Sequence, residues 1–317
     1  MASIATASRH SLTRGVADGH RVLVLGSHEA DLEVTLAPGL GMVACSLRHR
    51  GEELLGVRGG LAAYAARGET MGIPLLYPWA NRLGGPGYRF GSRRVTLPGG
   101  TPRDEHGLPI HGLLAAIRGW RVTGAGAGDG DAWASAELDA GARPDVLAGF
   151  PFPHVVRVEA KLRGGELTIE TTVRPTGTEA VPVTFGYHPY LRLPGVPRED
   201  WEIELAVARH LRLDAHGIPT AVSDAVGPVR GPLGRRQLDD GYVVAKGGRP
   251  FVLAGGGRRI EVAFERGYPF AQVFAPCDDE VICFEPMTAP TDALRGRPPS
   301  VAPGGTYSAR FSIKVTT

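Results

Sequence analysis

The chain has 317 residues, of which 43% are hydrophobic and 21% charged, a composition that excludes a disordered chain and a coiled coil. Its formal net charge of +2 is too balanced for a protein that binds nucleic acid by neutralising phosphates. The 45 glycines and 26 prolines are spread along the whole sequence, which indicates many turns and short elements, as in β proteins.

The start of the chain, residues 1–20, has no long apolar stretch, and we expect a flexible tail rather than a secretion signal. No apolar run approaches the ~20 residues that span a bilayer, so no membrane partner is expected. Cys45, Cys277 and Cys283 are odd in number and lack CxxC spacing, which favours a reduced, cytoplasmic protein without disulfides. Residues 21–317 show no linker, so we expect one domain, as a monomer or weak dimer.

Segments in which apolar and polar residues alternate recur along the chain, as antiparallel strands with one solvated face require. The clearest are 154–162, 166–173, 201–207, 258–264 and 307–315. Gly-rich sequences at 124–130, 163–165 and 255–257 are expected to connect strands as hairpins. Only 61–67 and 141–148 have a helical pattern. Roughly fifteen or more short strands with almost no helix predict an all-β sandwich or barrel.

The sequence contains no cofactor or metal motif. The stretch 124–130 does not satisfy GxGxxG and opens no helix, and GxxxxGK does not occur. His106 and His111 lie in one Pro/Gly-rich loop with no third ligand at motif spacing, so we predict no metal site.

Two polar positions stand out in the first half of the chain. In 72–85, an apolar run ends at Asn81 and Arg82, and the Arg82 guanidinium offers a planar fork of donors for adjacent hydroxyls or a carboxylate. A surface arginine at a strand end is the alternative. His111 lies between apolar residues in 108–114, where a buried core histidine is the alternative interpretation.

Two more positions lie in the second half. His188 is flanked by Tyr187 and Tyr190, aromatic residues that could receive the apolar face of a sugar ring or could be the buried tyrosines of a turn. Glu285 ends the apolar run VICF, where burial would raise its pKa above about 4.3 and make it a better base. An exposed glutamate at a strand end is the alternative.

The ordered set NR, IHG, YHPY, LDD and FEP resembles the aldose 1-epimerase (galactose mutarotase) family, and the resemblance extends over nearly the whole chain. It implies an antiparallel β-supersandwich with an open cleft that holds a free hexose, without metal or organic cofactor. It also implies that His188 is the general acid and Glu285 the general base. We expect the two side chains, an imidazolium and a carboxylate, to face each other across a pyranose-sized hollow.

The resemblance further implies residues that hold the sugar. Arg82 and His111 match such residues, and Asn81 stands beside Arg82 in the same motif. The family's aspartate is either Asp239 or Asp240, and the distance to the following aromatic residue favours Asp239. The chain departs from the family pattern after His111. The family has a pair of glycines there, and this chain has the single Gly112 followed by Leu113.

The function implied is the interconversion of α and β anomers of a free aldohexose such as glucose or galactose. Three alternatives remain. A hexose-6-phosphate epimerase would use an arginine cluster such as Arg89, Arg93 and Arg94. A non-catalytic sugar-binding protein would not need both His188 and Glu285. A glycoside hydrolase would pair Glu285 with Asp239.

Overall fold

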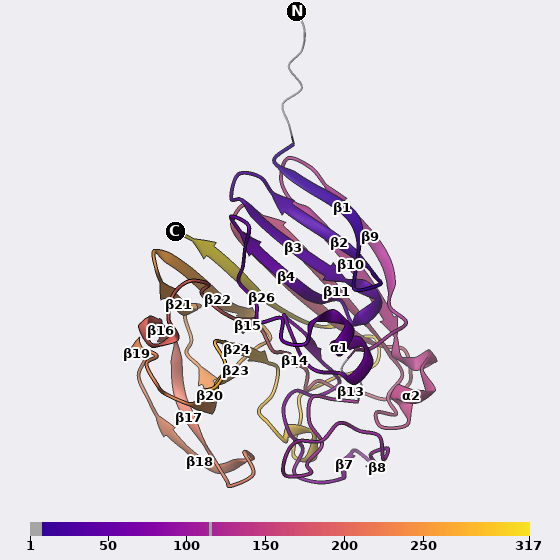
Figure 1. Cartoon of the computed structure of the whole chain (residues 1–317). Helices are drawn as coiled ribbons and strands as arrows, with labels where there is room; N and C mark the ends of the chain where they lie inside the picture. Colours follow the sequence, from indigo (N-terminus) through magenta and orange to yellow (C-terminus); the bar gives the residue numbers. More distant parts are fainter. Residues whose placement is uncertain (1–7, 114–115) are drawn as a thin grey trace, which may run out of the picture.

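A computed structural model of the chain describes residues 8–113 and 116–317 and is dominated by β-strands (Figure 1). The strands of every sheet pair antiparallel with their neighbours, which confirms the predicted all-β class. None of the helices in the described part of the chain has the length and apolar character to cross a bilayer.

The largest sheet has nine strands in the order β19-β16-β21-β22-β26-β12-β11-β10-β9. Its strands are β9 (Arg121–Ala127), β10 (Ala132–Asp139), β11 (His154–Arg163), β12 (Glu166–Pro175), β16 (Glu202–Leu205), β19 (Val229–Pro232), β21 (Phe251–Gly255), β22 (Arg258–Arg266) and β26 (Tyr307–Thr316). β26 follows every other strand in the chain and pairs with both β12 and β22 near the middle of this sheet. Buried and partly exposed residues alternate along β11 and β12, as the sequence predicts.

The expectation of a hairpin connection at 124–130 is wrong in its placement. Residues 124–127 belong to β9, and the turn to β10 follows at residues 128–131. The ring of Trp133 on β10 accounts for glycine in this part of β9, because a Cβ at Gly124 would lie 2.7 Å from that ring. The glycines therefore make room for an aromatic ring on the neighbouring strand rather than for a turn.

A five-stranded sheet contains β1 (His10–Ala17), β2 (His20–Ser27), β3 (Leu32–Ala37), β4 (Val43–His49) and β5 (Glu52–Glu53) in chain order. It packs against the β9–β11 side of the nine-stranded sheet (Figure 1). The flexible tail predicted for 1–20 therefore does not extend to residues 10–17, which pair with β2 along their whole length. β1 is an edge strand in which only His10 is buried, so its sequence lacks the apolar alternation that marks a half-buried strand.

An eight-stranded sheet carries most of the site described below. Its order is β18-β17-β20-β23-β24-β14-β6, and β15 also pairs with β24. The strands are β6 (Leu75–Leu76), β14 (Gly186–Tyr187), β15 (Tyr190–Leu191), β17 (Val207–Leu213), β18 (Pro219–Ala225), β20 (Leu238–Val244), β23 (Phe270–Ala275) and β24 (Ile282–Met287).

The remaining elements are short. Two strand pairs are formed by β7 (Gly87–Phe90) with β8 (Arg93–Thr96), and by β13 (Val181–Pro182) with β25 (Ser300–Val301). The predicted helices correspond to α1 (Gly60–Arg67), and to the 3-10 turn Ala140–Ala142 with α2 (Pro144–Leu147). Further 3-10 turns are Pro38–Leu40, Arg198–Asp200 and Ala293–Arg295.

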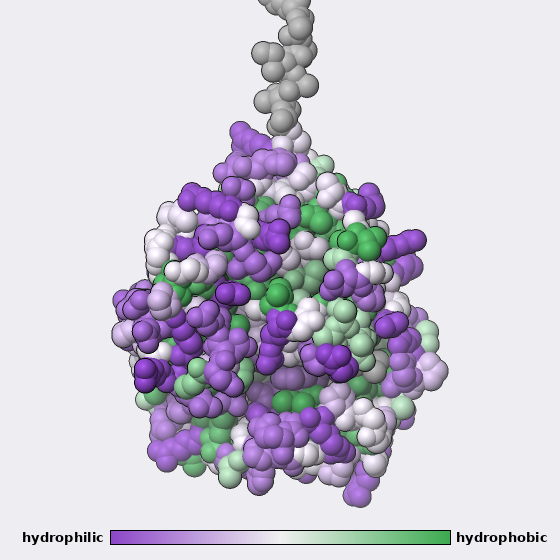
Figure 2. Space-filling view, viewed as in Figure 1, coloured by the Kyte–Doolittle hydropathy of each residue, from purple (hydrophilic) through white to green (hydrophobic). Residues whose placement is uncertain are grey.

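One large apolar core joins the three main sheets. Its largest fully buried side chains include Trp79, Trp201, Phe150 and Phe311. On the face seen in Figure 2, hydrophilic side chains cover most of the surface and apolar ones appear in separate patches between them. A core of this size fixes the strand register, and the register fixes which polar side chains meet.

Candidate active site

The segments that carry Asn81–Arg82 and His111 lie side by side. Arg82 forms an isolated antiparallel bridge with Ile110, and the amide of His111 donates to the carbonyl of Asn81 at 3.0 Å. Asn81 and His111 both have positive φ, 56° and 59°. Non-glycine residues rarely adopt this backbone, and it concentrates at functional sites. Two motifs that are 30 residues apart therefore form one unit.

Gly112 anchors this unit to the β6 region. Its φ is +89°, and a Cβ at this position would lie 1.9 Å from the carbonyl oxygen of Tyr77. Next to it, the amide of Leu113 donates to the same carbonyl at 3.2 Å. The close approach of the two backbones explains why a glycine follows His111. Gly112 alone allows this approach.

His188 and Glu285 meet across the eight-stranded sheet. His188 lies between β14 and β15, which both pair with β24, the strand that contains Glu285. Nε2 of His188 lies 3.2 Å from Oε1 of Glu285, and the side chains are only 6% and 2% exposed. The sequence predicts that the two groups converge, but the free protein has them in direct contact rather than on opposite sides of a hollow.

Burial controls the protonation of this pair. It raises the pKa of Glu285 well above its ordinary value, and the charge of Asp239 adds to this effect while Arg82 opposes it. Burial also lowers the pKa of His188 well below its ordinary value, and the charges of His111 and Arg58 act in the same direction. The expectation of an imidazolium at His188 is therefore wrong for the free protein. At neutral pH the His188 imidazole is therefore neutral, and the Glu285 carboxyl group keeps its proton to a higher pH than an exposed glutamate does.

His111 stands beside the pair. Its ring is edge-on to that of His188, with centroids 5.5 Å apart and an interplanar angle of 84°. Burial, assisted by the charge of Arg82, lowers the pKa of His111 to about 4, so this imidazole is neutral. Within the described residues, Nδ1 of His111, Nδ1 of His188 and Oε2 of Glu285 are buried and have no hydrogen-bond partner. Buried polar atoms are normally paired, so these three are available to a bound water or to the polar groups of a ligand.

The two adjacent aspartates of β20 point in different directions. Oδ1 of Asp239 accepts a hydrogen bond from Nε2 of Gln272 at 2.6 Å, and its Oδ2 lies 3.5 Å from Nη1 of Arg82. Gln272 is the cross-strand partner of Glu285. Asp240 instead pairs with His210 at 2.9 Å on the other face of the strand. Of the two candidates, Asp239 is thus the one that joins the other predicted site residues.

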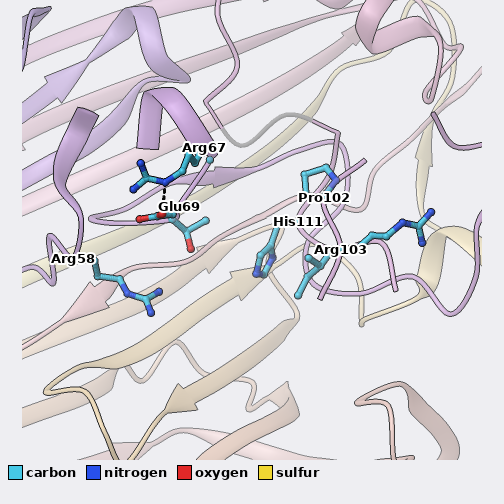
Figure 3. Close-up of a pocket in the computed structure, with 9 residues that line it drawn as sticks. Arg58, Arg67, Glu69, Pro102, Arg103 and His111 are labelled. Carbon is cyan, nitrogen blue, oxygen red and sulfur yellow. Dashed lines mark hydrogen bonds and ion pairs between the residues drawn. The ribbon is translucent and has the colours of Figure 1, made fainter. Parts of the chain in front are cut away.

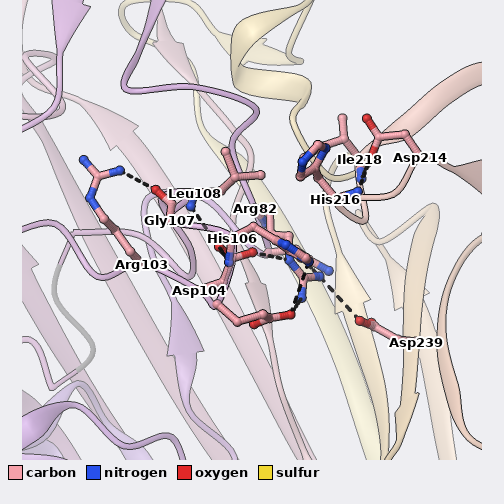
Figure 4. Close-up of polar contacts among 12 residues, drawn as sticks. Arg82, Arg103, Asp104, His106, Gly107, Leu108, Asp214, His216, Ile218 and Asp239 are labelled. Atoms are coloured by element: carbon pink, nitrogen blue, oxygen red, sulfur yellow. Dashed lines mark hydrogen bonds and ion pairs between the residues drawn. The ribbon is translucent and has the colours of Figure 1, made fainter.

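Arg82 is held by acidic side chains (Figure 4). Its Nε donates to Oδ2 of Asp104 at 2.7 Å, and its Nη2 lies 3.4 Å from Oε1 of Glu105. The side chain of Asp104 is 2% exposed. Burial alone would raise the pKa of Asp104, but the hydrogen bonds from Arg82 and from backbone amides hold it below its ordinary value. The guanidinium therefore has a fixed orientation next to Asp239.

A family model for aldose 1-epimerases matches residues 41–314. The chain belongs to the aldose 1-epimerase family. A curated relative in Escherichia coli (strain K12), the uncharacterized protein YihR, is 30% identical over 151 residues. That alignment covers 47% of this chain and 45% of the relative, so it spans about half the length of each protein.

Solved structures share the fold of this aldose 1-epimerase family member. A galactose mutarotase-like protein from Clostridium acetobutylicum superposes with a TM-score of 0.84 at 15% identity, over 97% of this chain and 98% of that one. Galactose 1-epimerase from Lactobacillus acidophilus NCFM has a TM-score of 0.78 at 15% identity, over 98% and 99% of the two chains. The predicted galactose mutarotase-like β-supersandwich is confirmed by this similarity.

In this aldose 1-epimerase family member, a cavity of about 380 Å³ opens beside His111 (Figure 3). Arg58, Arg67 and Arg103 contribute to its lining. Arg67 is paired with Glu69 at 2.6 Å, whereas Arg103 donates only to the carbonyl of Gly107 and has no ion-pair partner among the described residues. The described residues contain no group of three or more His, Cys, Asp or Glu side chains placed to share a metal ion.

The tyrosines around His188 do not form an exposed surface for a sugar. Tyr187 is buried, and its hydroxyl is 2.6 Å from that of Thr171. Tyr190 is also buried and stacks on the His188 ring, with centroids 4.3 Å apart and an interplanar angle of 14°. Its hydroxyl contacts Thr70 at 2.6 Å. Tyr190 therefore supports the imidazole from one side rather than presenting an open face to a ligand.

The arginines proposed for a phosphate group lie elsewhere. Arg89, Arg93 and Arg94 are on the β7–β8 strand pair, and Arg93 is paired with Glu179 at 2.5 Å. None of the three lines the cavity beside His111, and of the predicted site residues only His111 does. Sequence reasoning also missed Asp104 and Gln272, because a loop aspartate and a strand glutamine become distinctive only when the register sets them against Arg82 and Asp239.

Proposed function

We propose that the protein is a mutarotase that interconverts the α and β anomers of a free aldohexose such as glucose or galactose. The observation that supports this is the buried contact between His188 and Glu285, with free acceptor and donor positions on both residues and on the neighbouring His111. Opening a hemiacetal ring needs a base for the anomeric hydroxyl and an acid for the ring oxygen. In the proposed mechanism the pair holds a single proton, so that one of the two groups acts as the base and the other as the acid.

A His188–Glu285 pair that holds one proton can serve this reaction. A neutral carboxyl beside a neutral imidazole contains the same proton as a carboxylate beside an imidazolium, so moving it across the 3.2 Å contact converts one form to the other. In the proposed mechanism the sugar replaces this contact, and Arg82 favours the carboxylate form. Glu285 takes the proton of the anomeric hydroxyl while His188 protonates the ring oxygen and the C–O bond breaks. After rotation of the aldehyde group, the same transfers in reverse close the ring.

The sugar-holding roles follow from charge and position. Arg82 is fixed by Asp104 with its Nη1 directed toward Asp239, so the two residues together offer donors and acceptors to neighbouring hydroxyls. His111, neutral and edge-on to His188, has a free Nδ1 for a further hydroxyl. Asn81 uses its side-chain oxygen to accept from the amide of Arg82 at 2.8 Å. We therefore assign Asn81 to the positioning of Arg82 rather than to the sugar itself.

Polarimetry of freshly dissolved α-D-glucose and α-D-galactose tests the proposal. The wild-type protein should accelerate equilibration, and Glu285→Gln and His188→Asn should each lower kcat by about 10²–10⁴-fold. Glu261→Gln, on an outward-facing strand position paired with Arg259, is the control for a changed charge. Near wild-type rates in either site variant, with the fold retained by circular dichroism, would defeat the assignment.

A second candidate is an epimerase of acidic sugars, such as a hexose 6-phosphate. Arg103 favours it, since this arginine lines the cavity beside His111 and has no carboxylate partner among the described residues. The same polarimetric assay with glucose 6-phosphate separates the two. A kcat/KM at least tenfold higher for the phosphorylated sugar, lost in Arg103→Ala, would favour the second candidate. A non-catalytic sugar-binding protein would bind glucose without accelerating its equilibration.

A further inference from the structure

Two turns with matching sequences meet over Arg82 (Figure 4). Residues 104–108 read DEHGL and residues 214–218 read DAHGI. In both, Oδ1 of the aspartate accepts from the amides two and four residues later: for Asp104 at 3.0 and 2.8 Å, and for Asp214 at 2.8 and 3.0 Å. The rings of His106 and His216 touch edge-on, with centroids 5.3 Å apart, so the two turns contact each other.

The two turns approach Arg82 with different groups. Asp104 uses its second carboxylate oxygen to accept from Nε of Arg82 at 2.7 Å. The other turn approaches with its backbone at Gly217, where a Cβ would lie 2.9 Å from Nη1 and 3.3 Å from the central carbon of the guanidinium. Asp214 itself makes no hydrogen bond or ion pair with Arg82, and among the described residues its carboxylate accepts hydrogen bonds only within its own turn, from His216 and Ile218. Arg82 thus lies between a carboxylate and a glycine from two segments about 110 residues apart.

We propose that turns 104–108 and 214–218 form a two-sided clamp that holds Arg82 in the orientation in which it binds the sugar, with Asp104 and Gly217 as its positioning residues. The inference rests on the proposed function, because it takes Arg82 to contact the substrate. A guanidinium has many rotamers, and fixing it before the sugar arrives removes an ordering cost from binding. The clamp should therefore act on KM more than on kcat.

The matched turns provide a control for the carboxylate. In Asp104→Asn, the amide oxygen can still accept within the turn, but its NH₂ group opposes the Nε–H of Arg82. Asp214→Asn makes the same change in the same kind of turn without touching Arg82. We expect KM to rise about tenfold in Asp104→Asn, with kcat within about threefold, and both constants to stay within about twofold in Asp214→Asn.

The glycines provide a second control. Gly107 and Gly217 occupy the same place in the two turns and have nearly equal φ values of +74° and +73°. Alanine therefore strains both turns equally, but a Cβ at Gly107 meets no atom within 4 Å. KM should rise about tenfold in Gly217→Ala and stay within about twofold of wild type in Gly107→Ala.

A measurement on the substrate-free protein tests the clamp independently of enzymatic activity. In a ¹H–¹⁵N spectrum, the Nε–H signal of Arg82, identified by its loss in Arg82→Lys, should exchange slowly in wild type and rapidly in Asp104→Asn. Equal KM values in Asp104→Asn and Asp214→Asn, or equal Nε–H exchange in these two variants, would overturn the clamp. A wild-type protein that does not accelerate mutarotation would refute the proposed function, and the exchange rates would then decide the clamp separately.

Discussion

Replacing Gly112 by alanine tests whether the backbone contact beneath His111 sets both the stability of the fold and the geometry of the site. The new Cβ would lie 1.9 Å from the carbonyl oxygen of Tyr77, whereas ordinary contacts begin at 3.4 Å. One of the two backbones must therefore move by about 1.5 Å in a packed region that resists such shifts. His111, the neighbour of Gly112, moves with it.

The expected loss of stability is the sum of three contributions. The left-handed backbone costs an alanine about 1–2 kcal/mol, overpacking about 1–3 kcal/mol, and the weakened hydrogen bond from Leu113 to Tyr77 about 1 kcal/mol. The free energy of unfolding should fall by about 3–6 kcal/mol. For a chain of this length, that corresponds to a melting temperature lower by about 5–9 °C.

Urea unfolding and polarimetry on the same samples measure the two effects. The control is Gly257→Ala, where φ is +79° and a Cβ would meet no atom within 4 Å, so only the backbone cost of about 1–2 kcal/mol applies. We expect Gly112→Ala to reduce kcat/KM at least tenfold and the control to leave it unchanged. If Gly112→Ala were no less stable than Gly257→Ala and equally active, the steric account of this position would be wrong.

Two further predictions concern titratable groups. The kcat/KM of the free enzyme should depend on the one-proton form of the His188–Glu285 pair. That form is lost as pH falls through the lowered pKa of His188 and as pH rises through the raised pKa of Glu285, so the acid limb should lie below pH 6.5. An acid limb centred at or above 6.5 after subtraction of the spontaneous rate would contradict the assignment. Among the cysteines, Cys277 is exposed, Cys45 and Cys283 are buried, and burial raises the pKa of Cys45 to about 12. A thiol reagent should therefore modify one cysteine rapidly in the native protein and three in urea; two fast thiols before unfolding would refute this.

The sequence predicts those parts of the fold whose pattern is local. The alternation in β11 and β12 and the helical pattern at 61–67 depend only on neighbouring residues, and both are found in the structure. β1 was missed because an exposed edge strand needs no apolar alternation. The glycines of β9 were misread because their reason, the ring of Trp133, lies on another strand.

In the candidate site, too, some features could be predicted from local sequence and others depend on contacts between distant segments. His188 and Glu285 are distinctive in type and setting, so their motifs could be found before their positions were known. Their direct contact depends on the pairing of β14 and β15 with β24. Gln272 acquires a role only through the register that sets it opposite Glu285. A single sequence does not show which distant segments pair with each other.

The place of β26 in the nine-stranded sheet has a consequence for synthesis. Because β26 comes after both β12 and β22 in the chain and pairs with both, a growing chain cannot join the two parts of this sheet until about residue 316 has left the ribosome. Until then, both neighbours expose unpaired backbone edges, which are templates for association between chains. Premature termination within this strand should therefore give insoluble aggregates rather than a shortened enzyme.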